Sequence, residues 1–171
     1  FKSNIVTTDY PNNDAAPSIV SAAEVENGNF LLSGSLGRRN NWGGRPDLFL
    51  LKLTAHGDTL WTKTIVFNGN TQTSEKYAGN SVIMEGSTAY LISGNIDHSI
   101  FLLKVDLNGN LIWGRTYVAP ASTSVSNCVL LPANNGGFAL GFNAIWYDVP
   151  SRTSFADFGL LLTDKEGHIV T

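Results

Sequence analysis

Two stretches of the sequence concentrate the side chains that most often bind sugars and proteins. Residues 36–46 read LGRRNNWGGRP, and residues 144–156 read AIWYDVPSRTSFA. Trp and Tyr combine a flat apolar face with a polar edge, and with Arg they are enriched at contact surfaces. Both stretches interrupt an otherwise regular pattern, so we interpret them as binding loops. The candidate ligand-binding residues are Arg38, Arg39, Trp42, Arg45, Trp146, Tyr147 and Arg152. The alternative is that these aromatic side chains fold back over their own sheet.

The spacing of the other polar residues gives little support to catalysis or metal binding. Residues 106–110 (DLNGN) resemble the start of a calcium loop, but the closing Glu is missing, so we interpret them as a hairpin turn. His56 and His168 fall at repeated turn positions, and with His98 they are expected to lie far apart on the surface. There is no G-x-S-x-G element and no phosphate-binding loop. Cys128 lies among small residues in a strand that we expect to be buried. We predict no catalytic residue, no metal site and no cofactor.

Composition excludes several classes of protein. Hydrophobic residues make up 43% of the 171 residues and charged residues only 15%, which is typical of a folded chain rather than a disordered one. The net charge is −3 and there is no basic cluster beyond Arg38 and Arg39, so nucleic acid is not an expected partner. No apolar run approaches the roughly 18 residues that span a bilayer. The chain starts at Phe1 without a signal segment, so we expect a leader or an upstream part to have been removed.

The chain consists of three copies of one repeat. The segment DLFLLKLTAHGDTLWTKTIV (residues 47–66) recurs as SIFLLKVDLNGNLIWGRTYV (residues 99–118), and a third copy runs from 157 to 171. Upstream of each copy lies a second shared block that ends at Gly34, Gly94 or Gly141. The repeats cover approximately residues 1–60, 61–112 and 113–171.

Each repeat predicts four antiparallel strands. Runs of Val, Ile, Leu, Phe and Tyr are bounded by Asn-Gly and Gly-Asp, which adopt positive φ cheaply in hairpin turns. In the first repeat we expect strands over residues 18–25, 30–36, 47–53 and 59–66. Both faces of the third strand are apolar, which indicates sheets stacked on each other. No stretch has helical periodicity beyond a turn or two.

Four-stranded units of this length are typical of β-propeller blades, so the expected fold is an all-β set of propeller blades, the whole chain forming one domain or a fragment of one. A parallel β-helix is the main competitor, but its coils are shorter and need no paired hairpins. Residues 1–6 align with residues 61–66, so we expect an outermost first strand that closes the ring by pairing into the last blade. Three blades are fewer than the usual four to eight. Either more chain exists beyond residue 171, or several copies complete one ring.

The motif D-x-F-L-L-K-x-D-x-N-G-N-L-I-W, best matched by residues 101–117, resembles the tandem β-propeller repeats of secreted and lipid-anchored bacterial surface proteins. The third repeat departs from it, because Leu162 replaces Lys and Thr171 stands where Trp61 and Trp113 stand. The element D-x-x-G-x-x-x-W is also similar to the tryptophan-docking repeats of quinoprotein dehydrogenases and of an outer-membrane assembly propeller. The resemblance implies a propeller of about seven blades outside the cytoplasm. It also implies that the tryptophans brace neighbouring blades and do no chemistry.

From these observations we expect a non-enzymatic β-propeller module at the outer-membrane surface, in the periplasm or secreted. It would bind a protein or a glycan through loops on one face, as an accessory subunit of a surface complex, and an upstream lipid anchor would fit this role. A propeller lyase or hydrolase is one alternative, and it predicts Asp or Glu residues with shifted pKa values around the axis. A purely structural set of blades is another, and it predicts that the loops of Trp42 and Trp146 are buried against another polypeptide.

Overall fold

The chain forms three consecutive antiparallel β-sheets. A computed structural model describes residues 4–8, 15–38, 47–68, 77–96, 98–120, 123–148, 150 and 152–170. The elements are β1 (Asn4–Thr8), β2 (Ala15–Glu24), the 3-10 helix η1 (Glu26–Gly28), β3 (Phe30–Arg38), β4 (Asp47–Leu53), β5 (Thr59–Asn68), β6 (Tyr77–Glu85), β7 (Ala89–Ile96), β8 (Ser99–Asp106), β9 (Leu111–Val118), β10 (Thr123–Pro132), β11 (Phe138–Asp148) and β12 (Thr153–Thr163). Among these residues there is no helix with the length and apolarity needed to cross a membrane. The expected all-β class is confirmed.

Each sheet is made from one continuous stretch of chain, and within it strands β2–β5, β6–β9 and β10–β12 each form a meander. The strand orders are β1-β5-β4-β3-β2 in the first sheet, β6-β7-β8-β9 in the second and β10-β11-β12 in the third. The third sheet has the start of a fourth strand, because Ile169 forms an isolated bridge with Thr163. Tight turns at Gly57, Gly109 and Gly167 all have a φ of 78° to 90°, which a side chain rarely adopts. The hairpin turns expected at these glycines are confirmed.

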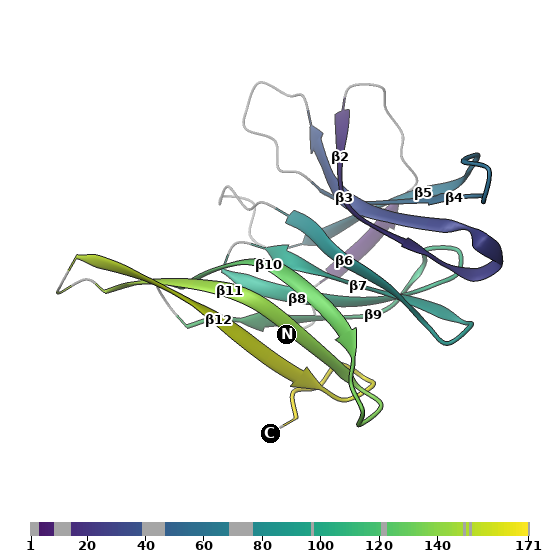
Figure 1. The fold of residues 1–171 in the computed structure, drawn as a ribbon. Helices are drawn as coiled ribbons and strands as arrows, with labels where there is room; N and C mark the ends of the chain where they lie inside the picture. The colour runs from purple at the N-terminus through teal and green to yellow at the C-terminus, as the bar shows by residue number, and fades with distance from the viewer. Residues whose placement is uncertain are drawn as a thin grey trace.

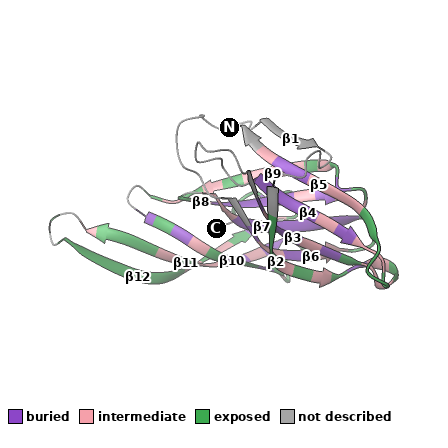
Figure 2. Ribbon diagram, turned by 90° about the horizontal axis from the view of Figure 1, so that it is seen from above, coloured by how far each residue is buried: buried purple, intermediate pink, exposed green. Residues whose placement is uncertain are grey.

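The three sheets stack face to face in chain order (Figure 1). The first and second sheets share a buried apolar cluster that includes Leu48 and Leu50 on one side and Phe101 and Leu103 on the other. A second cluster joins the second and third sheets. Figure 2 shows the buried positions concentrated in the first two sheets, with much of β11 and β12 exposed. The stack contains antiparallel sheets of five, four and three strands, an arrangement compatible with the blades expected from the sequence.

The first strands of the sheets, β2, β6 and β10, lie next to each other along the stack. Their small residues are explained by crowding. A Cβ atom on Gly79 of β6 would lie 2.7 Å from the Leu48 side chain and 3.1 Å from that of Ser33. The Ser33 hydroxyl donates a hydrogen bond to the Gly79 carbonyl at 3.3 Å. The small residues of these strands permit this close approach.

The position of β1 differs from the expectation. Its residues pair antiparallel with β5, from Asn4 opposite Asn68 to Thr8 opposite Thr64, so it is a fifth strand at the outer edge of the first sheet (Figure 2). Closure by pairing this strand into the last sheet, which we expected from the sequence, is therefore wrong. The edge of β5 offers unpaired backbone groups, and β1 pairs with them within the same sheet.

The strand register of the third sheet also corrects the sequence alignment. Gly34 and Gly94 lie opposite Phe49 and Phe101. In the third sheet the corresponding pair is Phe142 opposite Gly159, so Phe142, and not Gly141, is the counterpart of the two glycines. A Cβ atom on Gly159 would lie 2.2 Å from the Phe142 ring. In the first two sheets the glycine lies on β3 or β7 and the phenylalanine on the following strand, whereas in the third sheet the phenylalanine lies on β11 and the glycine on β12. Each sheet therefore pairs one phenylalanine with one glycine at this position.

Candidate functional site

The second predicted loop, residues 144–156, is mostly strand. Strands β11 and β12 pair without a break from Phe138 opposite Thr163 to Asp148 opposite Thr153. The resulting hairpin projects beyond the rest of the structure (Figure 1). Only the residues between Asp148 and Thr153 connect the strands. The prediction of an irregular loop was wrong here, because the aromatic residues extend the hairpin rather than interrupt it.

The end of this hairpin carries an exposed aromatic pair. Trp146 lies directly opposite Phe155, and the two rings stack with centroids 5.7 Å apart and planes 21° apart. Both side chains are exposed. Tyr147 is also exposed, but it is the next residue along β11 and therefore lies on the opposite face. The structure thus separates two residues that the sequence grouped, and it adds Phe155, which sequence reasoning missed.

Of the remaining predicted ligand-binding residues, one lies in a turn, one lies at the end of a strand, and three lie outside the described residues. Arg152 is exposed in the β11–β12 turn and has a φ of 53°. Arg38 is the last residue of β3. Arg39, Trp42 and Arg45 lie outside the described residues. The aromatic pair on the projecting hairpin is therefore the candidate site whose geometry can be described.

The repeated tryptophans dock on the turn of the next sheet. A Cβ atom on Gly109 would lie 3.0 Å from the Trp61 ring, and one on Gly167 would lie 3.0 Å from the Trp113 ring. The indole Nε1 of Trp61 donates a hydrogen bond to the Leu107 carbonyl at 3.1 Å. This agrees with the bracing role that the resemblance implies for Trp61 and Trp113.

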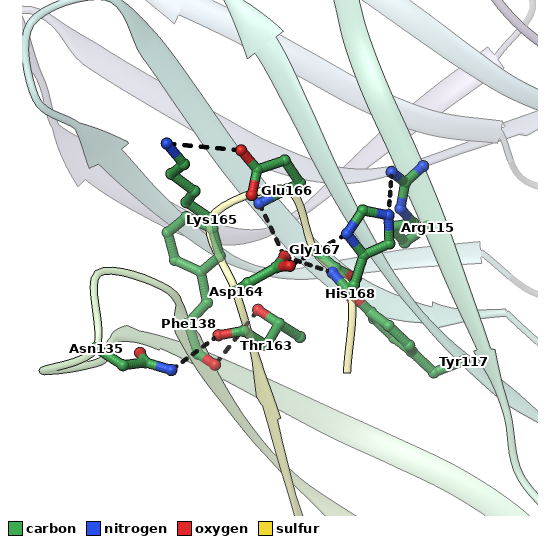
Figure 3. Close-up of polar contacts among 10 residues, drawn as sticks. All are labelled: Arg115, Tyr117, Asn135, Phe138, Thr163, Asp164, Lys165, Glu166, Gly167 and His168. Carbon is green, nitrogen blue, oxygen red and sulfur yellow. Dashed lines mark hydrogen bonds and ion pairs between the residues drawn. The ribbon is translucent and has the colours of Figure 1, made fainter. Parts of the chain in front are cut away.

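The turn of the third sheet shows how its polar residues are used (Figure 3). The Asp164 carboxylate accepts hydrogen bonds from the backbone N–H groups of Glu166 and His168, at 3.0 and 2.8 Å. The hydrogen bond from the His168 backbone holds the pKa of Asp164 below its usual value. From β9 of the second sheet, the Tyr117 hydroxyl donates to the Gly167 carbonyl at 2.8 Å. These polar groups stabilise the turn and its contact with the neighbouring sheet.

The calcium-like segment and the histidines are parts of the same turns. Asp106 accepts hydrogen bonds from the backbone N–H groups of Asn108 and Asn110, at 2.9 and 2.8 Å, so the hairpin-turn interpretation is confirmed. His98 is placed differently, because its Nδ1 lies 2.8 Å from the Thr123 carbonyl oxygen at the start of the third sheet. Within the described ranges, no three His, Cys, Asp or Glu side chains come together as a metal site would require.

Cys128 is fully buried in β10, as expected. Burial raises the pKa of its thiol to about 11, although the neighbouring Ser93 side chain acts in the opposite direction. A thiol with this pKa is protonated at neutral pH and is a poor nucleophile. The surroundings of Cys128 are those of a packing residue.

Between the first and second sheets lies a charged network that sequence reasoning missed. Glu26 forms an ion pair with the buried Lys52. The Tyr90 hydroxyl donates to both Glu26 oxygens, at 2.8 and 2.7 Å. Lys52 Nζ also donates to the Leu107 carbonyl at 3.3 Å and lies 5.4 Å from the centre of the Tyr90 ring. The repeat could have revealed Lys52 and its counterpart Lys104, but the contact of Glu26 with Tyr90 arises only when the first and second sheets pack together.

Gly109, which a tryptophan contacts, and its repeat counterpart Gly57, which none contacts, give a matched test of tryptophan packing. We expect Gly109→Ala to lower the free energy of unfolding by about 1 kcal/mol more than Gly57→Ala. Both glycines have positive φ, so alanine brings a similar backbone cost at each position. Only Gly109 lies against a tryptophan, since a Cβ atom on Gly57 would meet no atom within 4 Å. Urea unfolding of the two variants measures the difference, and equal losses would argue against docking.

Comparison with known proteins gives a likeness of fold. No protein-family model matches the sequence, and no curated protein matches it. Among solved structures, the sequence is similar in fold to a protein of the BT0996 RGII complex, with a TM-score of 0.50 and 8% sequence identity. The match covers 98% of the 171 residues and 59% of the other protein. At this identity the likeness concerns the fold alone.

Proposed function

We propose that this chain is a non-enzymatic binding module of β-propeller blades, which contacts a glycan or a protein through the connections at one end of its sheets. The exposed, stacked Trp146–Phe155 pair on the projecting hairpin carries this proposal. An aromatic surface held by two paired strands loses little conformational entropy when a sugar ring or an apolar side chain stacks on it.

A glycan is the first ligand class to test, because exposed aromatic rings stack well on sugar rings, and RGII is the first probe because the structural neighbour is named for an RGII complex. We further propose that the module acts outside the cytoplasm, as an accessory part of a bacterial cell-surface or outer-membrane complex. The similarity of its repeats to those of secreted and lipid-anchored surface proteins supports this placement. Protease treatment of intact cells tests it, since a protein at the cell surface would be degraded.

Two observations support a role without catalysis. Among the described residues, the carboxylates with shifted pKa values are Glu26, Asp106 and Asp164, and each has its pKa lowered. All three lie at turns and accept hydrogen bonds from neighbouring groups. A carboxylate that acts as a general acid needs a raised pKa.

We expect Trp146→Ala to weaken binding to an RGII preparation by about tenfold, because stacking anchors at interfaces are worth more than about 1 kcal/mol. Isothermal titration calorimetry measures the affinity. Phe155→Ala should act in the same direction, and Ile112→Ala, which removes an exposed apolar side chain from β9, should leave binding unchanged. Binding of Trp146→Ala with wild-type affinity would refute a role for the aromatic pair.

A further inference from the structure

The outer face of the third sheet, which is turned away from the second sheet, is apolar and exposed. The apolar residues at the equivalent positions of the first and second sheets are buried. In β4 and β8 these positions face the following sheet: Leu48 and Leu50 are both 0% exposed, Ile100 is 3% exposed and Leu102 0%. The corresponding residues of β12, Phe158 and Leu160, are 82% and 67% exposed. Apolar residues at the same position are thus covered in two sheets and uncovered in the third.

This face is wider than two residues. Leu162 continues it along β12, where the first two sheets have Lys52 and Lys104. Exposed Val129 and Leu131 extend it onto β10, since they lie opposite Gly141 and Ala139, which in turn lie opposite Leu160 and Leu162. A contiguous apolar surface across three strands is unusual on a protein that functions alone, and marks an interaction site.

The first sheet presents the complementary surface. The second sheet covers the first with Tyr90, Leu103 and Val105, all buried. The first sheet carries Phe30, Leu51 and Leu53 at the equivalent positions on its outer face, where Phe30 is exposed and the two leucines are half-buried. The space over Gly57 is open as well, whereas Gly109 and Gly167 are each covered by a tryptophan of the preceding sheet. Phe49, on the same face as Leu51, is only 4% exposed, so the part of this face that is open to a stacked sheet is the one around Phe30, Leu53 and Gly57.

We propose that the outer face of the third sheet docks another blade of this repeat, and that the occupant is the first sheet of a second copy of these 171 residues. The contact continues the stacking that already joins the first sheet to the second and the second to the third. Two copies related by a twofold axis make this contact twice and close a ring of six sheets, within the range of known propellers. The partner in this interface is thus a protein with the same fold and the same sequence.

Sedimentation equilibrium of the wild-type protein and two classes of variant tests the proposal. We expect the wild type to be a dimer. Leu160→Asp on the third sheet and Phe30→Asp on the first should each raise the dimer dissociation constant by at least about tenfold, because each places an unpaired charge in an apolar contact. Both residues are exposed, so circular dichroism should show an unchanged fold. Ile112→Asp, at an exposed position of β9 outside these faces, is the matched control and should remain a dimer.

Mixing the two variants distinguishes head-to-tail pairing from other contacts. A mixture of the Leu160→Asp and Phe30→Asp variants retains one of the two contacts unaltered, so it should dimerise more strongly than either variant alone. A wild-type protein that stays monomeric would overturn the proposal, even if it bound a hydrophobic dye. A Leu160→Asp variant that dimerises like the wild type would overturn it equally.

Discussion

Replacing Glu26 with alanine is expected to lower the free energy of unfolding by about 3–5 kcal/mol, because it leaves the buried Lys52 ammonium without its carboxylate. The Tyr90 hydroxyl loses its two acceptor atoms in the same variant. Chemical denaturation monitored by circular dichroism measures the change. The second sheet supplies a matched control, since its counterpart lysine, Lys104, pairs with Glu85 at 2.5 Å and both of these side chains are more exposed. Glu85→Ala should therefore lower the free energy of unfolding by clearly less than Glu26→Ala does.

A double variant separates the cost of an unpaired charge from the value of the ion pair. Glu26→Leu combined with Lys52→Met removes both charges and leaves apolar side chains between the sheets. We expect it to be markedly more stable than Glu26→Ala, because a buried pair is worth far less than the penalty for breaking it. A double variant as unstable as Glu26→Ala would show that the loss of stability arises from something other than the unpaired Lys52 ammonium group.

The same network should make the protein sensitive to acid. Burial alone would raise the pKa of Glu26, but the hydrogen bonds from Lys52 and Tyr90 outweigh it and hold the pKa below its usual value of 4.5. The unfolded chain therefore binds a proton at Glu26 before the folded chain does. The stabilisation is complete above about pH 4.5 and is lost as the pH falls through the folded value. In Glu26→Gln, stability should fall less steeply over this acidic range than in the wild type.

Local signals in the sequence were sufficient for most of the strands and for the repeated glycine turns, although not for the strands of residues 144–156. The glycines at positions 57, 109 and 167 require positive φ, and the apolar runs between them alternate as strands do. The first sheet therefore appears where the pattern predicts it, with β4 at the expected residues 47–53. The position of each of these turns could be predicted because it depends on residues that are adjacent in the chain.

The errors concern contacts that local signals do not determine. Whether β1 pairs with β5 or with the last sheet depends on which edge is nearer in space. The register of Phe142 against Gly159 depends on where one ring fits over a glycine, which a pattern of similar residues does not reveal. The hairpin end around Trp146 looked irregular because its aromatic residues suggested binding, although such residues also form stable cross-strand pairs. Glu26 was missed because its partners Lys52 and Tyr90 are distant in sequence, and Phe155 was missed because the extension of its own hairpin was not predicted.

Removing the indole of Trp61 should be the second most costly of these changes, with an expected loss of about 2–3 kcal/mol in the free energy of unfolding. The variant Trp61→Ala loses the ring that packs on Gly109 and the hydrogen bond to the Leu107 carbonyl, so the first sheet is held less firmly to the second. Trp61→Phe keeps an aromatic ring but has no donor, and it should lose about 1 kcal/mol. Urea unfolding of both variants measures these losses.

Trp146→Ala is the control, because this exposed indole stacks within its own hairpin and its removal should change stability by less than about 1 kcal/mol. The tryptophans then divide by function: Trp61 joins one sheet to the next, and Trp146 leaves its face open for a ligand. If Trp146→Ala destabilised the fold as much as Trp61→Ala, the hairpin would be part of the structural core, and its aromatic pair could not be assigned to binding.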